Sequence, residues 1–153
     1  MRVSSFVSKR RRASAPEVAG LSLLLVAMLS LSISPAALAK DTSPPTFAGL
    51  KSATTCIPGP VGGGRTTSYH LSWDSATDNR TPSRQIVYDV YQATAPGGED
   101  FSKPTYTTAA GATSFDTPPL PTDKAFYFVV RARDRAGNSD SNKVERQGQN
   151  LCV

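Results

Sequence analysis

The sequence predicts an all-β fold, a seven-stranded antiparallel β-sandwich, behind an N-terminal export signal. From residue 40 onward, short runs of β-branched and aromatic residues alternate with polar residues, and Gly, Pro, Asn and Asp separate the runs. No long helical periodicity occurs in this part. Its 114 residues are close to the roughly 100 residues of a β-sandwich domain, so we expect a single domain.

Residues 1–39 have the pattern of a signal peptide. Lys9–Arg12 form a positive segment, Leu21–Ile33 form an apolar stretch, and Ala37-Leu38-Ala39 supplies the small residues that a signal peptidase accepts. The alternative is an uncleaved membrane anchor, but a spanning helix needs about 20 apolar residues and Pro35 ends this run sooner. We expect cleavage after Ala39 and a secreted, periplasmic or cell-surface protein that is free of the membrane.

Most of the excess positive charge lies in this leader. The chain has 17 Lys and Arg residues against 12 Asp and Glu residues, whereas residues 40–153 contain 12 basic and 11 acidic ones. A nucleic-acid-binding surface needs basic residues gathered on the folded domain, so we expect no nucleic-acid partner. One His and two Cys residues exclude multi-His metal sites and disulfide-dense scaffolds.

Seven strands are expected in the domain, residues 40–148, and residues 149–153 are expected to form a short tail. The strands cover residues 47–54, 68–74, 86–92, 105–108, 113–116, 125–134 and 139–147. Period-two alternation gives three of them an apolar face, formed by Tyr69, Leu71 and Trp73, by Ile86, Tyr88 and Val90, and by Phe126, Phe128, Val130 and Ala132. Such faces need a second layer to cover them, and two packed antiparallel sheets provide it.

Several segments occur in an order and spacing that resemble the fibronectin type III family, in the form found beside bacterial secreted carbohydrate-active enzymes. They are Asp41-Thr42-Ser43-Pro44-Pro45, Leu71-Ser72-Trp73, Ala76-Thr77-Asp78-Asn79, Tyr88-Asp89-Val90-Tyr91, Thr113–Thr117 with Leu120, and Val130–Asn138. The resemblance implies an immunoglobulin-like sandwich. The sequence departs from the family at Phe126, where the family usually has a Tyr whose hydroxyl ties a corner of the sandwich. An immunoglobulin domain proper is disfavoured because Ala132 stands where its second cysteine belongs.

The two cysteines are expected to form a disulfide. In a simple antiparallel arrangement the first and seventh strands run in the same direction, so Cys56 and Cys152, which follow them, emerge at the same end. Closing a loop between residues 96 positions apart contributes up to roughly 4.7 kcal/mol in the chain-entropy model. The alternatives are two free thiols or pairing with another chain.

No catalytic, cofactor or metal site is predicted. His70 is the one imidazole, and we interpret it as a surface residue on the polar face of an edge strand. Gly62-Gly63-Gly64 precedes a strand rather than a helix, which argues against phosphate binding. Four aspartates are expected to converge on one pole, where calcium is an alternative, but local turn chemistry explains them better: Asp74, Asp78, Asp134 and Asp140.

Two surfaces are candidates for binding a partner. The first is the pole that carries Asp78, Arg80, Arg84 and Arg135, and the second is the outer face of a sheet with Val87, Tyr91, Tyr127, Val129, Arg131 and Arg133. Ordinary solvated surface is the alternative for both. We expect a monomeric, non-enzymatic module that binds a protein or a polysaccharide at or outside the cell surface. The alternative is a structural component of an envelope or extracellular assembly without a soluble ligand.

Overall fold

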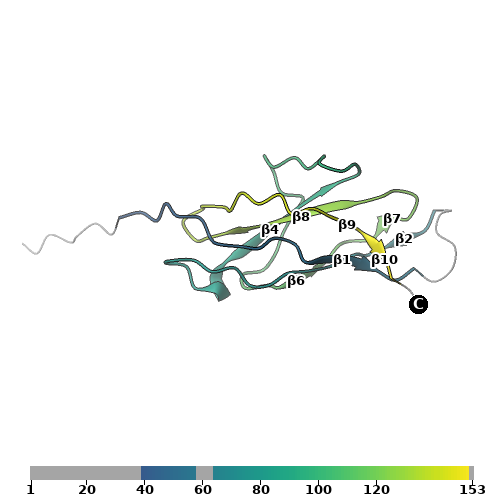
Figure 1. Cartoon of the computed structure of the whole chain (residues 1–153). Helices are drawn as coiled ribbons and strands as arrows, with labels where there is room; N and C mark the ends of the chain where they lie inside the picture. Colours follow the sequence, from purple (N-terminus) through teal and green to yellow (C-terminus); the bar gives the residue numbers. More distant parts are fainter. Residues whose placement is uncertain (1–38, 58–63, 152–153) are drawn as a thin grey trace, which may run out of the picture. The chain divides into compact units, whose positions relative to one another are not determined.

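The computed structural model describes residues 39–57 and 64–151, and this part of the chain is all-β (Figure 1). Besides the short 3-10 helix η1 (Ser83–Gln85), its regular structure consists of ten strands. These are β1 (Ser52–Thr55), β2 (Thr66–Thr67), β3 (His70–Ser72), β4 (Val87–Ala93), β5 (Tyr106–Thr107), β6 (Ser114–Asp116), β7 (Leu120–Pro121), β8 (Tyr127–Arg133), β9 (Arg146–Gln147) and β10 (Gln149–Asn150). The predicted signal peptide, apart from Ala39, lies outside the described residues.

The strands form two four-stranded sheets and a small two-stranded one. One sheet has the order β10-β1-β3-β6 and the other the order β5-β4-β8-β9, while β2 pairs with β7. Across the space between the two larger sheets, the Trp73 ring lies 5.3 Å from the Tyr88 ring, and the Tyr69 ring lies 5.5 Å from the Phe128 ring. The apolar core therefore lies between two sheets, which agrees with the predicted β-sandwich.

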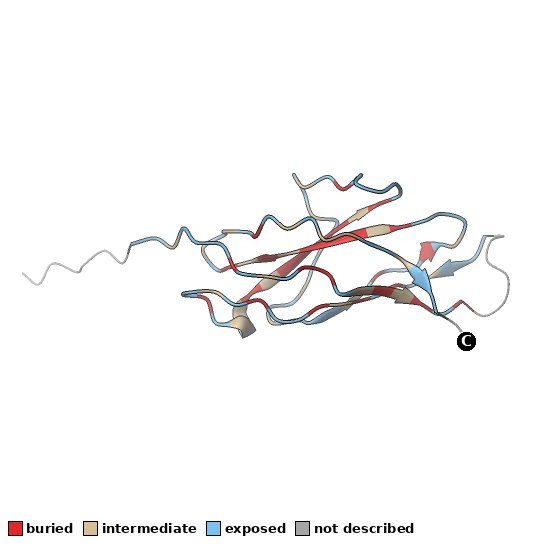
Figure 2. Cartoon of the chain, viewed as in Figure 1, coloured by how far each residue is buried: buried red, intermediate tan, exposed pale blue. Residues whose placement is uncertain are grey.

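The predicted inner faces are confirmed by burial. The three apolar lines form one connected core, and Figure 2 shows the buried residues as red segments of the strands. Its members include Tyr69, Leu71, Trp73, Ile86, Tyr88, Val90, Phe126, Phe128, Val130 and Ala132, none of them more than 6% exposed. Alternation identified these residues because β3, β4 and β8, at the centre of the two sheets, each bury one apolar face.

The predicted seventh strand is mostly absent as a strand. Ser139 forms one bridge with Arg133, and regular pairing with β8 resumes only at β9. Between these points, two side chains hydrogen-bond the backbone of β8. The Asp140 carboxylate accepts a hydrogen bond from the Ala132 amide, and the Asn142 side-chain amide donates to the Val130 carbonyl at 2.9 Å. Residues 140–145 therefore run along β8 without forming a ladder.

The chain then crosses from one sheet to the other at Gly148. Its amide donates to the Phe126 carbonyl at 2.8 Å, and a Cβ at this position would lie 2.3 Å from the Tyr69 ring. Only glycine permits such a close approach. The crossing lets β10 pair in parallel with β1, with Thr55 opposite Asn150. The expectation of a separate tail from residue 149 is therefore wrong for residues 149 and 150.

The loop between β3 and η1 is anchored to the core from within. The Tyr88 hydroxyl accepts a hydrogen bond from the Ala76 amide at 2.7 Å, and the Ser83 hydroxyl donates to the Ala76 carbonyl at 2.7 Å. The Arg135 amide donates to the Thr81 hydroxyl at 3.3 Å. These contacts hold residues 76–81 against the turn after β8, and both segments carry candidate site residues.

Candidate functional site

The outer face of the β4–β8 pair, predicted to be an open surface, is partly covered by the loop between β4 and β5. Tyr91 is 6% exposed, and its ring lies 5.1 Å from the ring of Phe101 in that loop. The Arg131 guanidinium lies 3.7 Å from the centre of the Phe101 ring, in cation–π geometry. Burial, and next the Asp89 carboxylate, raise the pKa of Tyr91. The expectation that Tyr91 is available to a partner is therefore wrong.

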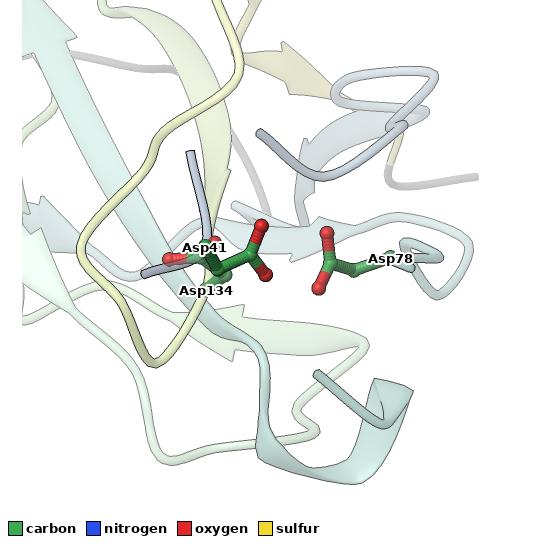
Figure 3. A group of neighbouring side chains, drawn as sticks. All are labelled: Asp41, Asp78 and Asp134. Carbon is green, nitrogen blue, oxygen red and sulfur yellow. The ribbon is translucent and has the colours of Figure 1, made fainter. Parts of the chain in front are cut away.

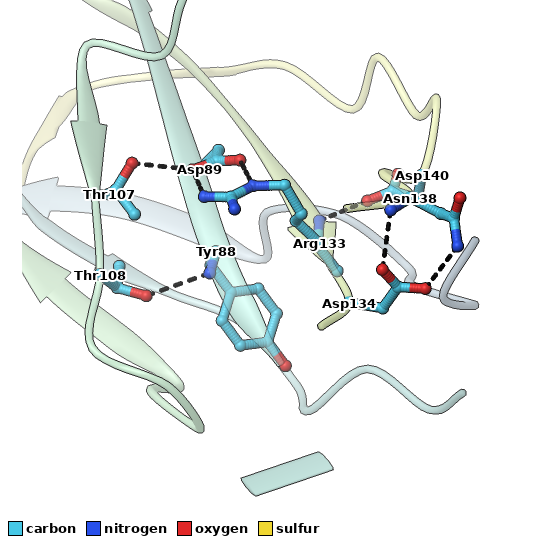
Figure 4. A network of polar contacts seen from close by, with 9 residues as sticks. Tyr88, Asp89, Thr107, Thr108, Arg133, Asp134, Asn138 and Asp140 are labelled. Atoms are coloured by element: carbon cyan, nitrogen blue, oxygen red, sulfur yellow. Dashed lines mark hydrogen bonds and ion pairs between the residues drawn. The ribbon is translucent and has the colours of Figure 1, made fainter. Parts of the chain in front are cut away.

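The charged groups of this face have partners within the chain. Asp89 is 3% exposed and accepts hydrogen bonds from Arg133 Nε at 2.7 Å, Arg133 Nη2 at 3.1 Å and the Thr107 hydroxyl at 2.8 Å (Figure 4). The hydrogen bond with Asp89 raises the pKa of Arg133. Arg131 Nε donates to the Asn142 carbonyl at 3.0 Å. Tyr127 and Val87 are half-buried and Val129 is buried, so this face offers little open surface.

The predicted arginine pole, which we define as Arg80, Arg84 and Arg135, is exposed. Arg80 Nη1 donates to the Ala39 carbonyl at 2.7 Å, and Arg135 Nη1 donates to Gln85 Oε1 at 3.2 Å. Arg80 and Arg135 line one shallow hollow together with Asp41, Thr81 and Ala136. Arg84 belongs to η1, which also carries Gln85. The fold thus brings the three predicted arginines to one end of the sandwich.

A group of carboxylates lies beside this hollow. We call Asp41, Asp78 and Asp134 the aspartate cluster: each contributes one carboxylate oxygen, and these oxygens all lie within 4.8 Å of one another (Figure 3). Sequence reasoning predicted two of its members and missed Asp41, although Asp41 begins the first of the segments that resemble fibronectin type III domains. Asp41 comes close to Asp78 and Asp134 because of the path of residues 39–46, and the alternation of apolar and polar residues does not predict that path.

Two other aspartates predicted for this pole are not in the cluster. Asp74 is exposed and forms an ion pair with Lys51 at 3.3 Å. Asp140 is buried and is used by the backbone of β8 and by Asn142. Asp74 and Asp140 are therefore not members of the aspartate cluster, and each has a structural partner of its own.

Local hydrogen bonds orient the cluster. Asp78 Oδ1 accepts from the amides of Arg80 at 3.1 Å and Thr81 at 2.6 Å. Desolvation raises the pKa of Asp78, but these backbone hydrogen bonds together lower it below its usual value. Asn138 donates from its side chain to Asp134 Oδ2 at 2.7 Å and to the Asp41 carbonyl at 3.1 Å, and its backbone amide donates to Asp134 Oδ1 (Figure 4).

The unpaired oxygens of the cluster are unusual. Asp41 Oδ2 and Asp78 Oδ2 are shielded from solvent and have no hydrogen-bond partner within the described residues. Buried polar atoms are almost always hydrogen-bonded, and two like charges about 4 Å apart repel by roughly 1 kcal/mol in water and about 4 kcal/mol near a protein surface. Repulsion among these carboxylates is therefore offset only in part by the hydrogen bonds of the cluster, and a cation would offset it further.

His70 is exposed, as predicted, but β3 is not an edge strand. It lies between β1 and β6, and His70 Nδ1 is 2.7 Å from Asp116 Oδ1 on β6. Both side chains are more than half exposed. The pair stands on the open outer face of a sheet, where it stabilises a cross-strand contact.

The two segments that precede the cysteines lie side by side. β1 and β10 pair in parallel, and the Leu151 amide donates to the Thr55 carbonyl at 2.9 Å. These residues come directly before Cys152 and Cys56. Because Cys152 lies outside the described residues, the disulfide stays a prediction.

No protein-family model and no curated protein matches the chain. Within residues 39–57 and 64–151, none of the helical structure has the length and apolar character that a bilayer crossing requires. The function of the chain is therefore inferred from the geometry of the arginine pole, the aspartate cluster and the covered outer face.

Proposed function

We propose that this chain is an exported, non-enzymatic binding module with a fibronectin type III-like sandwich, and that it binds a protein or polysaccharide bearing acidic groups through the arginine pole. The observation that carries the proposal is the shallow hollow between Arg80 and Arg135, with Arg84 on the adjoining η1. Guanidinium groups bind carboxylates, sulfates and phosphates with two parallel hydrogen bonds, which makes arginine suited to such partners.

The family assignment is supported by the order of elements. The core between two sheets and the tail that returns beside β1 agree with a small immunoglobulin-like sandwich. Seven of the ten strands overlap the seven expected ranges, namely β1, β3, β4, β5, β6, β8 and β9, whereas β2, β7 and β10 lie outside them. Export is proposed from the pattern of residues 1–39.

The pole is the better of the two predicted surfaces. On the outer face, Tyr91 is buried, Arg131 stacks on Phe101, and Arg133 is paired with Asp89. A partner would have to displace those contacts before it could bind there. At the pole, the arginines extend from loops that the core anchors through Ala76 and Thr81. Exposed side chains on rigidly held loops are typical of binding sites.

A non-enzymatic role is supported by the position of the one histidine. His70 and Asp116 form an exposed pair on a sheet face, whereas general-base catalysis needs the histidine within hydrogen-bond reach of a reacting group. The aspartate cluster is oriented by backbone amides and by Asn138, an arrangement that suits ligand binding as well as structure.

The experiment is retention of the purified protein on immobilised polygalacturonate, dextran sulfate and polyglutamate, with neutral dextran as the uncharged reference. The variant R80S/R84S/R135S should lose about tenfold or more in affinity for the acidic matrix that retains the wild type. Circular dichroism and thermal unfolding establish that the variant is folded.

A matched control removes three exposed basic residues elsewhere, in the variant K103Q/K124Q/K143Q. This control variant has the same net charge as the pole variant, and the acidic matrix should retain it as strongly as it retains the wild type. If both variants lost the same affinity for the matrix, overall charge rather than the arginine pole would explain the binding. If no acidic matrix retained the wild type, the proposal would be rejected. Assembly of the wild type into large particles without retention would favour the structural role instead.

The proposed disulfide between Cys56 and Cys152 is supported by the parallel β1–β10 pairing that precedes both residues. Intact mass measured before and after reduction should increase by two hydrogens. An unchanged mass would leave two thiols and would remove the constraint on the segment between β1 and β2.

A further inference from the structure

We propose that the aspartate cluster is a calcium-binding site. Its three members come from distant parts of the sequence: Asp41 lies before β1, Asp78 in the loop after β3, and Asp134 directly after β8. Nevertheless, one carboxylate oxygen of each lies within 4.8 Å of the others (Figure 3). Figure 3 shows the Asp78 carboxylate directed toward those of Asp41 and Asp134.

A second observation, independent of the clustering, indicates that a ligand belongs here. Asp41 and Asp78 are only partly buried as residues, but their Oδ2 atoms are shielded from solvent and accept no hydrogen bond from the described residues. Ordinary turn chemistry accounts for the other oxygen of each carboxylate, since Asp41 Oδ1 accepts from the Ser43 amide at 3.1 Å and Asp78 Oδ1 accepts from the Thr81 amide at 2.6 Å. It leaves the two Oδ2 atoms unexplained.

The nearest arginine does not neutralise these oxygens. Arg80 follows Asp78 by two residues, but it forms no ion pair with the cluster among the described residues. Asp134, which is 4% exposed, has both oxygens held by Asn138 at 2.7 Å. An oxygen-coordinated cation would supply the positive charge that the cluster otherwise lacks, and it would bind the two shielded oxygens directly.

The donor set selects the kind of ion. All three ligands are hard carboxylate oxygens, which suit calcium or magnesium rather than zinc or copper. Two ligands at calcium distances of about 2.3–2.6 Å span at most about 5.2 Å, whereas two magnesium ligands at about 2.0–2.1 Å span at most about 4.2 Å. The three oxygens lie within 4.8 Å of one another, a limit inside the span of calcium ligands, and their irregular arrangement on three loops suits calcium's tolerance of irregular geometry.

Asn138 is the positioning residue of the proposed site. Its side-chain amide donates to Asp134 Oδ2 at 2.7 Å and to the Asp41 carbonyl at 3.1 Å, so one residue holds two of the three ligand-bearing segments together. Hydrogen bonds of this kind keep metal ligands oriented before the ion arrives. Bound calcium would join residues 41–43 to the loops after β3 and β8.

The experiment is isothermal titration of the metal-free, purified protein with calcium chloride and with magnesium chloride, together with thermal unfolding in EDTA and in excess calcium. We expect one calcium ion per chain, affinity for magnesium at least about tenfold weaker, and a higher midpoint of thermal unfolding with calcium because the ion binds the folded state.

Isosteric variants identify the ligands. D41N and D78N retain the oxygen that accepts the backbone amide but lose the carboxylate charge, and each should weaken calcium binding by about tenfold or more. D74N is the matched control, because Asp74 is exposed and pairs with Lys51; it should bind calcium like the wild type.

Unfolding midpoints of the variants in EDTA show that each is folded. The proposal would be overturned if the wild type showed neither a heat of calcium binding nor a calcium-dependent midpoint of unfolding. It would also be overturned if D74N and D78N lost the same calcium affinity. None of these measurements depends on the partner proposed for the arginine pole, so the two proposals can fail separately.

Discussion

The two faces of the β4–β8 pair are both largely shielded from solvent, but by different means. On the inner face, Tyr88, Val90, Phe128 and Val130 are completely buried in the shared core. On the outer face, burial involves charges: Asp89 is 3% exposed and paired with Arg133. Nothing in the outer face belongs to the main apolar core, so a second, partly polar layer covers the same two strands.

The difference shows how far an alternating pattern can be interpreted. Alternation states which side chains share a face, and it identifies the inner face because apolar groups must leave water. It does not state whether the polar face is open. Here Phe101, in a loop of irregular sequence, covers Tyr91 and stacks with Arg131, so a surface that resembles a binding face is engaged within the chain.

The largest expected effect comes from truncating the inner face. F128A removes a completely buried ring that contacts Tyr69, and it should lower the free energy of unfolding by about 3–5 kcal/mol because of lost burial and the remaining cavity. Urea denaturation followed by tryptophan fluorescence measures this. A loss below about 1 kcal/mol, the size of an ordinary surface substitution or smaller core change, would contradict the proposed core.

An intermediate effect is expected from the ion pair of the outer face. R133M leaves the Asp89 carboxylate buried with the Thr107 hydroxyl as its remaining side-chain donor, and it should lower the free energy of unfolding by about 3 kcal/mol.

The double variant D89L/R133M tests the cause of that loss. Replacing both partners by apolar groups removes the uncompensated charge, so the double variant should recover most of the stability that R133M loses. If the double variant lost as much free energy of unfolding as D89L and R133M lose together, the pair would contribute through packing rather than through charge.

The smallest effect concerns the loop that covers the outer face. Desolvation of Glu99, and next the neighbouring Glu145 carboxylate, raise the pKa of Glu99 in the folded protein. Below the unfolded value of 4.5 both states are protonated; as the pH rises, the unfolded state releases its proton first. Stability should therefore decrease from about pH 4.5 upward, until the pH passes the raised folded pKa.

E99Q removes the titrating group while keeping its shape. It should flatten this decrease, so that the variant becomes slightly more stable than the wild type at neutral pH and not at acidic pH. Midpoints of urea denaturation over the same pH range measure the difference. A constant difference at every pH would mean that Glu99 stabilises the loop by packing alone.

Most of the core could be predicted from the sequence, and only part of the candidate site. Tyr69, Leu71 and Trp73 were identified because their spacing on one strand determines their common face. Arg80 and Arg135 were assigned to one pole because alternate antiparallel loops emerge at the same end. Asp41 was not assigned, since it lies in a segment with one isolated bridge, Thr46 to Thr77, and no periodic pattern.

The predicted seventh strand shows the same limit of prediction from the sequence. Its residues include one β-branched side chain, Val144, among several types that are uncommon in strands, and Asp140 and Asn142 use their side chains to hydrogen-bond β8. Side-chain bonds of this kind compete with backbone pairing, and their geometry depends on where β8 lies. Sequence propensity alone does not show where side-chain hydrogen bonds to β8 replace backbone pairing with it.

The sequence by itself determined the all-β class, the inner faces of the strands and the residues of the core, because burial of apolar side chains follows their spacing along the chain. The tertiary structure decided that Phe101 covers the outer face and that Asp41 meets Asp78 and Asp134. Those contacts join residues far apart in the chain through irregular loops, whose paths follow from packing against the finished sandwich rather than from any local pattern.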